Sequence, residues 1–454
     1  MSNQFELMKQ QRFLPFFSVQ FLGAFNDNVF KTALITLVTF HAASLTNMSG
    51  VTLTTLLPGL FILPFFLFSA TAGQIADKFE KSRLIRIIKV FEIWIMVFAS
   101  AGFFLNNIWL LGAALFMMGM HSTLFGPVKY AYLPQHLTEP ELIGGNGMVE
   151  MGSFVAILLG QVLGAWLAMS KQHALFTSIT ILAIGLLGYV ASRAIPHSAA
   201  ADDRLKINWN PITETIKNVQ MVWANQTIWL AIIAISWFWF YGATLLAQFP
   251  NLARDVLYGD ESLFILQLSV FSLGIGIGSL LCEKLSKAKL ELGLVLFGAF
   301  GLTVFGADLY LSASSLHNSC SQQCLFNYQT FMTSQVQDTE GYLKWTPWRL
   351  LADIGLIGLF GGFYIVPLYV LLQTCANKNV QSRVIAANNI LNALFMVVSS
   401  LVSTALFVQG LTIPQLFLAT SLLNIVVMFY LCIRQPEYWR TFLCWIKREK
   451  TRIR

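Results

Sequence analysis

Asp27, Lys129 and Glu150 are ionisable side chains that lie inside long apolar segments of this sequence. A charge at the centre of a membrane helix costs about 2.5 to 3.5 kcal/mol on insertion scales, so such residues are kept for a ligand path or an ion pair. Lys129 is at the end of a predicted helix, where Pro127 frees backbone groups, and a cation beside freed backbone suits a phosphate. With their polar neighbours, these positions form the predicted ligand-binding set: Asp27, Asn28, Lys129, Tyr130, Asn146 and Glu150.

Several of these charges also have explanations that need no ligand. Asp27 can pair with Lys31, which is one turn later on the same helix face. Lys129 can extend its ammonium group to the membrane interface. Glu92, in another apolar segment, can pair with Lys89 or with another helix. The sequence alone leaves these alternatives open.

Polar residues in the second half of the chain are expected to be structural. Arg349 and Asp353 are one helical turn apart, and we expect them to form an ion pair. Asn388, Asn389 and Asn392 offer uncharged polar groups, which more often form hydrogen bonds between helices than bind ligands.

A motif between the second and third apolar segments has the composition of a gate. It reads Gly73-Gln-Ile-Ala-Asp77-Lys78-Phe-Glu-Lys81-Ser-Arg83. Gly73 lets two helices approach closely. Asp77 is predicted to form a gating ion pair across the inner mouth, with Lys81 and Arg83 as the basic residues behind it. An ordinary basic loop would explain the Lys and Arg residues but not the spacing from Gly73 to Asp77.

The elements that position these residues must be membrane helices. The chain of 454 residues is 56% hydrophobic and 11% charged, whereas soluble globular chains usually carry about 25% charged residues. Its apolar runs are long enough to cross the hydrocarbon core as helices, which takes about 20 residues. The alternating pattern of a membrane barrel is not visible. We therefore predict an all-α membrane protein and exclude a soluble one.

The apolar segments divide into two sets of six. We predict an N-terminal six-helix bundle (1–196), a cytoplasmic linker with a surface-lying helix (197–224), a C-terminal six-helix bundle (225–435) and a basic cytoplasmic tail (436–454). A degenerate copy of the gate motif, from Gly278 to Lys287, indicates pseudo-symmetric halves. The twelve predicted helices are at 13–41, 50–76, 84–105, 107–131, 142–169, 173–195, 225–257, 262–283, 290–314, 345–374, 383–409 and 412–434.

The distribution of basic residues predicts the topology. Most of the 29 Lys and Arg residues fall in alternate loops, and loops rich in these residues stay in the cytoplasm. Both termini are therefore predicted to be cytoplasmic, in a bacterial cytoplasmic membrane. This topology explains the formal net charge of +7 and gives no reason to expect nucleic acid as a partner. The basic, aromatic tail either lies on the anionic membrane surface or forms a disordered end.

Two local features concern packing and covalent structure. Gly152, Ala156, Gly160 and Gly164 recur at four-residue steps, which creates a face of small residues that another helix can approach closely. A disulfide is predicted between the cysteines of the outer loop, Cys320 and Cys324, although their spacing permits the bond without demanding it.

One segment matches an enzyme motif, but we do not interpret it as an active site. His197-Ser-Ala-Ala-Ala-Asp202 matches the His-x4-Asp pattern of glycerolipid acyltransferases. That chemistry requires a folded domain, and this linker is too short to bury a core. We predict no catalytic residue, cofactor or metal.

The motifs around the intramembrane charges resemble one family. The chain is similar to the lysophospholipid transporter family of the major facilitator superfamily in the motifs Gly23-Ala-Phe-Asn-Asp27-Asn28, Gly126-Pro-Val-Lys129-Tyr130 and Asn146-Gly-Met-Val-Glu150. The phrase Gly361-Gly-Phe-Tyr-Ile-Val-Pro367-Leu368 also resembles the transporter domain that some bacteria fuse to an acyltransferase and an acyl-carrier-protein synthetase. One departure is Leu246, where the family has an Arg in its seventh helix.

This resemblance implies a twelve-helix major facilitator that moves lysophospholipids, such as lysophosphatidylethanolamine, from the outer to the inner leaflet by alternating access. It ties Asp27, Lys129 and Glu150 to substrate or gating. We expect a monomer among membrane lipids. Two other functions stay open: a proton-coupled major facilitator for a small metabolite or siderophore, with Asp27 or Glu150 as the proton carrier, and a membrane partner that recruits a separate acyltransferase.

Overall fold

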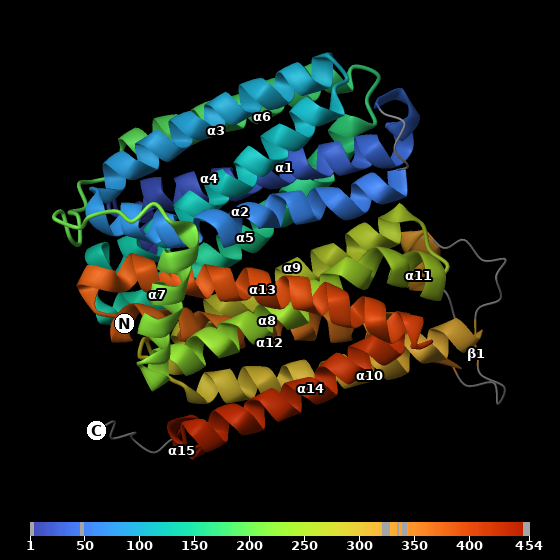
Figure 1. Cartoon of the computed structure of the whole chain (residues 1–454). Helices are drawn as coiled ribbons and strands as arrows, with labels where there is room; N and C mark the ends of the chain where they lie inside the picture. The colour runs from blue at the N-terminus through green and yellow to red at the C-terminus, as the bar shows by residue number, and fades with distance from the viewer. Residues whose placement is uncertain are drawn as a thin grey trace. The chain divides into compact units, whose positions relative to one another are not determined.

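The computed structural model describes residues 4–45, 50–319, 327–333, 336–337, 343–344 and 346–447, which are mostly helical (Figure 1). Twelve of the described helices have 21 to 32 residues. They are α1 (Leu14–Leu45), α2 (Gly50–Lys78), α3 (Lys81–Phe104), α4 (Ile108–His136), α5 (Glu139–Ala168), α6 (His173–Arg193), α8 (Gln226–Asn251), α9 (Glu261–Ser286), α10 (Gly293–Ser319), α12 (Thr346–Cys375), α13 (Gln381–Val408) and α14 (Ile413–Arg434).

Shorter elements join the long helices. A π-helical turn, η2, extends α8, and two strands pair antiparallel with Val336 opposite Lys344. The short elements are η1 (Gln4–Lys9), α7 (Pro211–Trp223), η2 (Leu252–Val256), α11 (Tyr328–Thr333), β1 (Val336–Gln337), β2 (Leu343–Lys344), η3 (Lys378–Val380) and α15 (Glu437–Ile446). The surface-lying helix predicted in the linker corresponds to α7, whose Ile212 and Trp223 are exposed.

The twelve long helices confirm the predicted all-α membrane class. Eleven of the described helices are long and apolar enough to cross a membrane. The twelfth, α1, has 32 residues and so exceeds the length needed to span. Four polar or charged residues interrupt the apolar sequence of α1: Asn26, Asp27, Asn28 and Lys31.

Polar caps fix where several helices begin. The Glu80 side chain accepts hydrogen bonds from the backbone N–H groups of Ser82 and Arg83, and so caps α3. Thr138 and Glu141 form a capping box at the start of α5, with Thr138 N donating to Glu141 Oε2 at 2.9 Å. Such caps satisfy N–H groups that have no partner within the helix.

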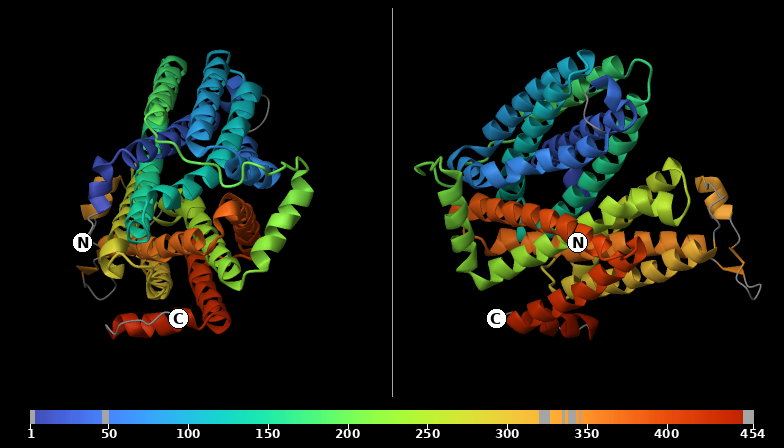
Figure 2. Two further views of the ribbon diagram at one scale, coloured as in Figure 1. Left: turned by 90° about the vertical axis from the view of Figure 1, so that its left-hand side faces the viewer. Right: turned by 45° about the vertical axis from the view of Figure 1, so that its right-hand side comes forward.

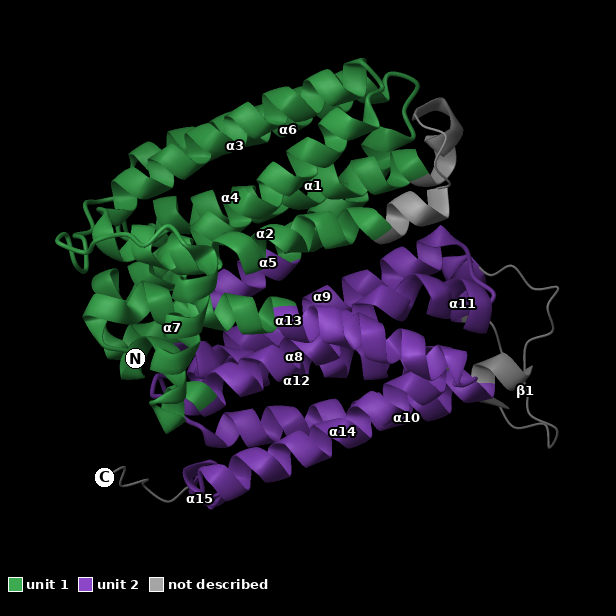
Figure 3. Ribbon diagram, viewed as in Figure 1, with its two compact units in different colours: residues 1–145, 155–229, 372–393 green, residues 146–154, 230–371, 394–454 purple. Residues whose placement is uncertain are grey.

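The helices group into two compact units, which Figure 3 shows in separate colours. The first unit consists of residues 1–145, 155–229 and 372–393, and the second of residues 146–154, 230–371 and 394–454. The linker and the start of α13 therefore belong with the helices of the first unit. The bundle boundaries at 196 and 225 stay predictions of the sequence.

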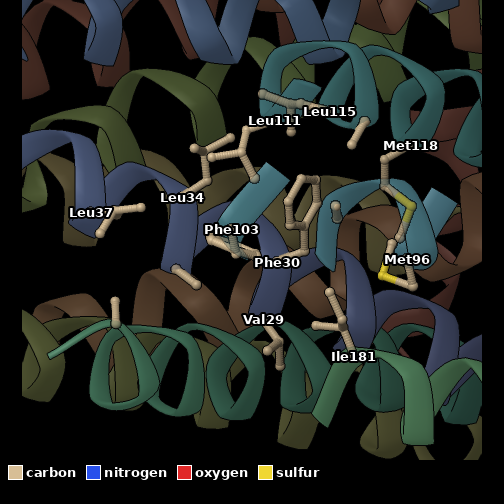
Figure 4. Packing of buried hydrophobic residues seen from close by; sticks show 14 of the residues in the cluster. Val29, Phe30, Leu34, Leu37, Met96, Phe103, Leu111, Leu115, Met118 and Ile181 are labelled. Carbon is tan, nitrogen blue, oxygen red and sulfur yellow. The ribbon is translucent and has the colours of Figure 1, made fainter. Parts of the chain in front are cut away.

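In the first unit, a hydrophobic core joins α1, α3, α4 and α6. Figures 1 and 2 show α3 beside α6. Phe30 of α1 meets Phe103 of α3 edge to face, with ring centroids 6.0 Å apart, and Leu111 and Ile181 complete the contact from α4 and α6 (Figure 4). Large apolar side chains buried in this way make truncation costly, at about 3 to 5 kcal/mol for Phe to Ala.

The small residues of α5 do what their spacing predicts. A Cβ atom on Gly160 would lie 2.7 Å from the carbonyl oxygen of Phe25, and one on Gly164 would lie 2.5 Å from that of Val29. Only glycine leaves room for this approach, so α5 packs its backbone directly against α1. This contact holds in place the part of α1 that carries Asp27.

The second unit has its own polar contacts between helices. Asn424 of α14 accepts a hydrogen bond from Trp237 Nε1 of α8 at 2.8 Å and donates to the carbonyl oxygen of Ala299 in α10 at 2.9 Å. The Tyr241 hydroxyl of α8 donates to the carbonyl oxygen of Leu302 at 2.8 Å. These bonds satisfy buried polar groups that lipid cannot solvate.

The expected pair of Arg349 with Asp353 is wrong. Arg349 instead forms a two-pronged ion pair with Asp308 of α10, with Arg349 Nε 2.9 Å from Asp308 Oδ2. Asp353 accepts a hydrogen bond from Ser312 Oγ at 2.9 Å. A planar guanidinium binds a carboxylate best when both can align, and here that alignment occurs between two helices.

Two predictions concern segments at the edges of the described residues. The tail begins with α15, an amphipathic helix that exposes Trp439 and Ile446 and buries Tyr438; residues 448–454 lie outside the described part. The predicted disulfide between Cys320 and Cys324 also lies outside it, because residues 320–326 are not described.

Candidate functional site

Asp27 faces α4 and lacks one hydrogen-bond donor. Ser122 Oγ of α4 donates to Asp27 Oδ2 at 2.7 Å. The other carboxylate oxygen, Oδ1, is buried without a hydrogen-bond partner among the described residues. Leaving a buried polar atom without a hydrogen-bond partner costs about 1 to 3 kcal/mol, and the cost is higher when the group is charged. A donor from a bound ligand would remove that cost.

Lys31 makes no direct pair with Asp27. In the described part of the chain no ion pair joins the two side chains, and the Lys31 ammonium instead lies 5.3 Å from the ring centroid of Phe61 on α2. A cation at this distance is attracted by the ring. The structure therefore does not form the contact on which the ligand-free explanation of Asp27 depends.

A buried charge cluster centres on Glu92 of α3. Lys89 forms an ion pair with Glu92, Asn26 Nδ2 donates to Glu92 Oε1 at 2.8 Å, and His121 Nε2 lies 3.2 Å from Glu92 Oε2. The side chains of Lys89, Glu92 and His121 are each exposed by 4% or less. The pairing of Glu92 with Lys89, one of the alternatives left by the sequence, is confirmed.

The sequence reasoning missed His121 and Ser122. Both lie in the middle of the apolar helix α4, and His121 is within electrostatic reach of Asp27. An ionisable residue in a membrane helix is the same signal that identified Asp27, so His121 could have been found from the sequence. Ser122 could not, because an uncharged hydroxyl in an apolar segment usually bonds its own helix backbone.

Lys129 lies on the same face of α4 as Ser122. The two residues are about two turns apart, which is roughly 10 Å along the helix axis. The sequence predicted Lys129 at the end of its helix. This prediction is wrong, because α4 continues through Pro127 to His136. The Lys129 ammonium is 4.9 Å from the ring centroid of Tyr130. Asp27 and Lys129 thus border one face of α4.

The start of α13 and the end of α12 cover the same part of α4. Gln373 Nε2 donates to the carbonyl oxygen of Tyr130 at 3.2 Å. Gly126 leaves room for Asn389, whose amide nitrogen would lie 2.6 Å from a Cβ atom at that position. Both amide atoms of Asn388 are buried without a partner among the described residues, so its expected hydrogen bond between helices is not formed.

The other predicted binding residues divide between the units. Asn28 donates to the carbonyl oxygen of Ala24 at 2.8 Å, and its Oδ1 is buried without a hydrogen-bond partner in the described chain. Asn146 and Glu150 are exposed by 0% and 4% and belong to the second unit. Their roles in binding a ligand stay predictions.

Asp77 holds the end of α2 against the start of α13. Asp77 Oδ1 accepts from the backbone N–H of Ser382 at 3.0 Å, and Oδ2 forms an ion pair with Arg383 Nε at 3.0 Å. Gly73 makes this approach possible, since a Cβ atom there would lie 2.7 Å from that of Ala386. Asp77 therefore forms an ion pair between two helices with a partner far away in the sequence, and its role in gating stays a prediction.

The two basic residues of the gate motif have different surroundings. Lys81 is buried, and its ammonium donates to the carbonyl oxygen of Ala199 in the linker at 3.3 Å. Arg83 is exposed, and its backbone N–H donates to Glu80 at 2.7 Å. Neither forms the ion pair with Asp77; Arg383, which sequence reasoning missed as a gate residue, does.

The linker is bound to the turn between α2 and α3. The carbonyl oxygen of Asp77 accepts from the backbone N–H groups of Ala201 and Asp202 at 2.8 and 3.0 Å. Glu80 accepts from Ser198 N at 2.8 Å. Partial burial acts to raise the pKa of Glu80, but hydrogen bonds from Ser198 and from the capped N–H groups outweigh it and lower that pKa. The segment that resembles an acyltransferase motif, His197 to Asp202, is thus a surface segment bound by hydrogen bonds to the turn between α2 and α3.

This arrangement of long helices, buried charges and a paired gate motif is that of a membrane transporter. Residues 16–337 match the family model of the Major Facilitator Superfamily. The chain belongs to this superfamily and is a multi-pass membrane protein.

Named relatives within the superfamily transport one class of lipid. The chain is 28% identical over 387 residues to the lysophospholipid transporter LplT of Escherichia fergusonii, with 82% of each chain covered. It is 29% identical over 390 residues to LplT of Escherichia coli O157:H7 (strain EC4115 / EHEC), again with 82% of each covered.

Solved structures agree on the fold. The chain matches the major facilitator FucP in the outward conformation with a TM-score of 0.67 at 12% identity, covering 94% of this chain and all of FucP. It matches the human organic anion transporter MFSD10 with a TM-score of 0.68 at 13% identity, covering 92% of this chain and 99% of that one.

Proposed function

We propose that this chain is a flippase that moves lysophospholipids, such as lysophosphatidylethanolamine, across the bacterial cytoplasmic membrane by alternating access. The observation that carries the proposal is the placement of a partly buried anion, Asp27, and a cation, Lys129, along one face of α4. The similarity to LplT supports the same substrate class.

The two charges complement a zwitterionic headgroup. The Oδ1 atom of Asp27 lacks a donor, which the ammonium group of ethanolamine would supply. Lys129 would bind the phosphate as a point charge. Because water is scarce between the helices, each attraction is stronger than in bulk solution. The single acyl chain would remain against apolar helix faces.

The proposed direction of movement is from the outer to the inner leaflet. If both termini lie in the cytoplasm, as the topology predicts, the pair of Asp77 with Arg383 would lie at the inner mouth of the transporter. A closed inner gate would leave the headgroup site accessible from the outer leaflet, and release of the gate would deliver the headgroup inside. Recruitment of a separate acyltransferase, which would reacylate the delivered lipid, stays a prediction.

A second candidate function is the proton-coupled transport of a small metabolite. His121 favours it, because it lies 3.2 Å from Glu92 and within electrostatic reach of Asp27. Histidine is a side chain that commonly serves as a proton shuttle in proteins. In that case transport would depend on a proton gradient.

A transport assay in proteoliposomes tests both candidates. The full chain is reconstituted, and entry of labelled lysophosphatidylethanolamine is compared with that of labelled water-soluble solutes. Movement of the lipid, lost in Asp27→Asn and retained in Lys171→Gln, supports the flippase. Transport of solutes without movement of lipid would favour the metabolite carrier.

A further inference from the structure

A cavity of about 480 Å³ with several polar side chains in its lining lies within the first unit, close to the ion pair of Asp77 with Arg383. Four segments line it: the end of α4, the start of α5, the linker, and the junction between α12 and α13. The residues that matter for its chemistry are His136, His197, Ser198, Gln373, Lys378 and Gln381.

Hydrogen bonds between these segments hold the cavity walls. Gln381 Nε2 donates to the carbonyl oxygen of Gln373 at 2.8 Å, and Gln373 Nε2 donates to that of Tyr130 at 3.2 Å. Ser198 Oγ donates to Gln135 Oε1, which joins the linker to α4. Gln373, Gln381 and Ser198 are each exposed by 4% or less. The cavity is therefore preformed by fixed groups.

The charges of the cavity favour an anion. His136, His197 and Lys378 contribute basic groups, whereas the only acidic residue that lines it in the described chain is Glu139. Glu139 is exposed in the first turn of α5. Glu80 is nearby, but its oxygens accept hydrogen bonds from the linker and the start of α3. Among the described lining residues, basic side chains therefore outnumber acidic ones.

His136 has a nitrogen atom ready for a ligand. Its Nε2 atom is buried and has no hydrogen-bond partner among the described residues. The ring stacks on Tyr132 with centroids 4.1 Å apart, and the His136 carbonyl oxygen accepts from Arg12 Nη1 at 2.5 Å. These contacts hold the residue in place without using Nε2, so this nitrogen atom is available to a ligand.

We propose that this cavity binds a phosphate-bearing anion, with His136 and Lys378 as its main contacts. The several acceptor oxygens of a phosphate can satisfy donors from different segments at once. The volume is within the range of small-molecule pockets, about 300 to 1,000 Å³, and leaves room for a glycerophosphodiester as well as for inorganic phosphate. This second site goes beyond the proposed transport path and does not depend on which solute is moved.

Occupation of the cavity would act on the gate. Gln381, in its wall, directly precedes Ser382, whose backbone N–H binds Asp77. Lys378 lies in η3, the turn that leads into the same end of α13. An anion held between this turn and His136 of α4 would bind only the arrangement in which α13 is close to α4, and so would stabilise it.

Calorimetric titration of the purified full chain in detergent tests the proposal. The probes are inorganic phosphate and sn-glycero-3-phosphoethanolamine. His136→Gln and Lys378→Gln are each expected to weaken binding about tenfold or more, the loss typical of a hydrogen bond to a charged group. Lys171 is exposed in the turn between α5 and α6, so Lys171→Gln is the matched control and should bind like the parent. Lys378 is exposed, so its variant should fold even if His136→Gln does not.

The two probes distinguish the ligand sources. Tighter binding of the glycerophosphodiester, lost in Lys378→Gln, supports a headgroup site; binding of phosphate alone, lost in the same variant, supports a site for free phosphate. The proposal is overturned if neither probe binds. It is also overturned if the probes bind Lys378→Gln and a folded His136→Gln as tightly as the parent. Lys129→Ala separates this site from the transport path: inorganic phosphate should bind to it as tightly as to the parent, and loss of phosphate binding in this variant would overturn the proposal by placing the anion at Lys129.

Discussion

The Ser122 hydroxyl donates a hydrogen bond to one oxygen of Asp27, and the other oxygen has no hydrogen-bond partner among the described residues. The hydroxyl orients the carboxylate toward α4 but cannot neutralise it. Lys31, the nearest basic residue in the sequence, lies over Phe61 instead. The carboxylate is thus held in place while part of its binding capacity is unused, as expected for a residue that binds a ligand.

We expect Asp27→Asn to lower lysophospholipid transport at least about tenfold, equivalent to about 1.4 kcal/mol. Asparagine keeps the shape and the bond to Ser122 but removes the negative charge that would bind an ammonium group. Because Lys31 makes no direct pair with Asp27, the yield and thermal stability of the variant should remain close to those of the parent. Initial rates in proteoliposomes measure the effect, and a parental rate would exclude Asp27 from the substrate path.

Lys129→Ala should also lower transport at least about tenfold. Its ammonium is the proposed contact for the phosphate, whereas the Tyr130 ring beside it can only hold the side chain. Lys171→Ala is a suitable control because Lys171 is exposed. If well-folded Lys129→Ala protein moves the lipid at the parental rate, then Lys129 is a structural residue that reaches the interface.

Asp77 and Arg383 should behave as one unit in a double-mutant cycle. Asp77→Asn and Arg383→Gln are each expected to slow transport, because each removes the ion pair between α2 and α13. The double variant should be no slower than the slower single variant, with a coupling energy of about 0.5 to 3 kcal/mol. Losses that simply multiply would show that the two side chains act independently.

Glu80 should make stability depend on pH. Its pKa in the folded protein is lower than the ordinary value of 4.5 because of hydrogen bonds from Ser198, Ser82 and Arg83. The stabilisation is therefore fully present above pH 4.5 and is lost as the pH falls through the folded pKa. In Glu80→Gln, the melting temperature should be lower at neutral pH and should fall less on acidification than in the parent. The exposed Glu437→Gln variant, which lacks such contacts to the linker, should follow the parent curve.

Transport of lysophospholipid is expected not to need a proton gradient. A substrate ammonium can neutralise Asp27 directly, so this carboxylate need not titrate during the cycle. An uncoupler added to vesicles with an unchanged lipid gradient should leave the rate as it was. Loss of lipid movement under these conditions would favour proton coupling, and His121 beside Glu92 would then be the first residue to replace.

Helices were largely predictable because apolar runs leave few alternatives in a membrane. The predicted helix 383–409 and the observed α13, Gln381–Val408, differ by two residues or fewer at each end. The fourth helix was predicted to end at residue 131 but continues to His136, through Pro134. A proline weakens a helix locally, but packing of this segment against the linker and the start of α13 compensates for the lost bond.

The partners of the charged residues were less predictable. The spacing from Gly73 to Asp77 indicated a gate, but nothing near it in the sequence identified Arg383. Arg349 was expected to pair with the nearby Asp353 but binds Asp308 of another helix. Sequence proximity identifies only partners on the same helix, whereas buried charges are paired by whichever helix tertiary packing brings within reach.

Hydrogen bonds attach the linker to α2 on both sides of its exposed residues Asp203 and Arg204. Asp203 and Arg204 are exposed, while Asn208 exchanges two hydrogen bonds with the Gln74 side chain, at 2.8 and 3.1 Å. The preceding residues, up to Asp202, are bound to the end of α2. A protein made as two fragments, divided between Asp203 and Arg204, would therefore keep both new ends attached to the same helix. We therefore expect the two fragments, produced separately, to assemble without a peptide bond between them.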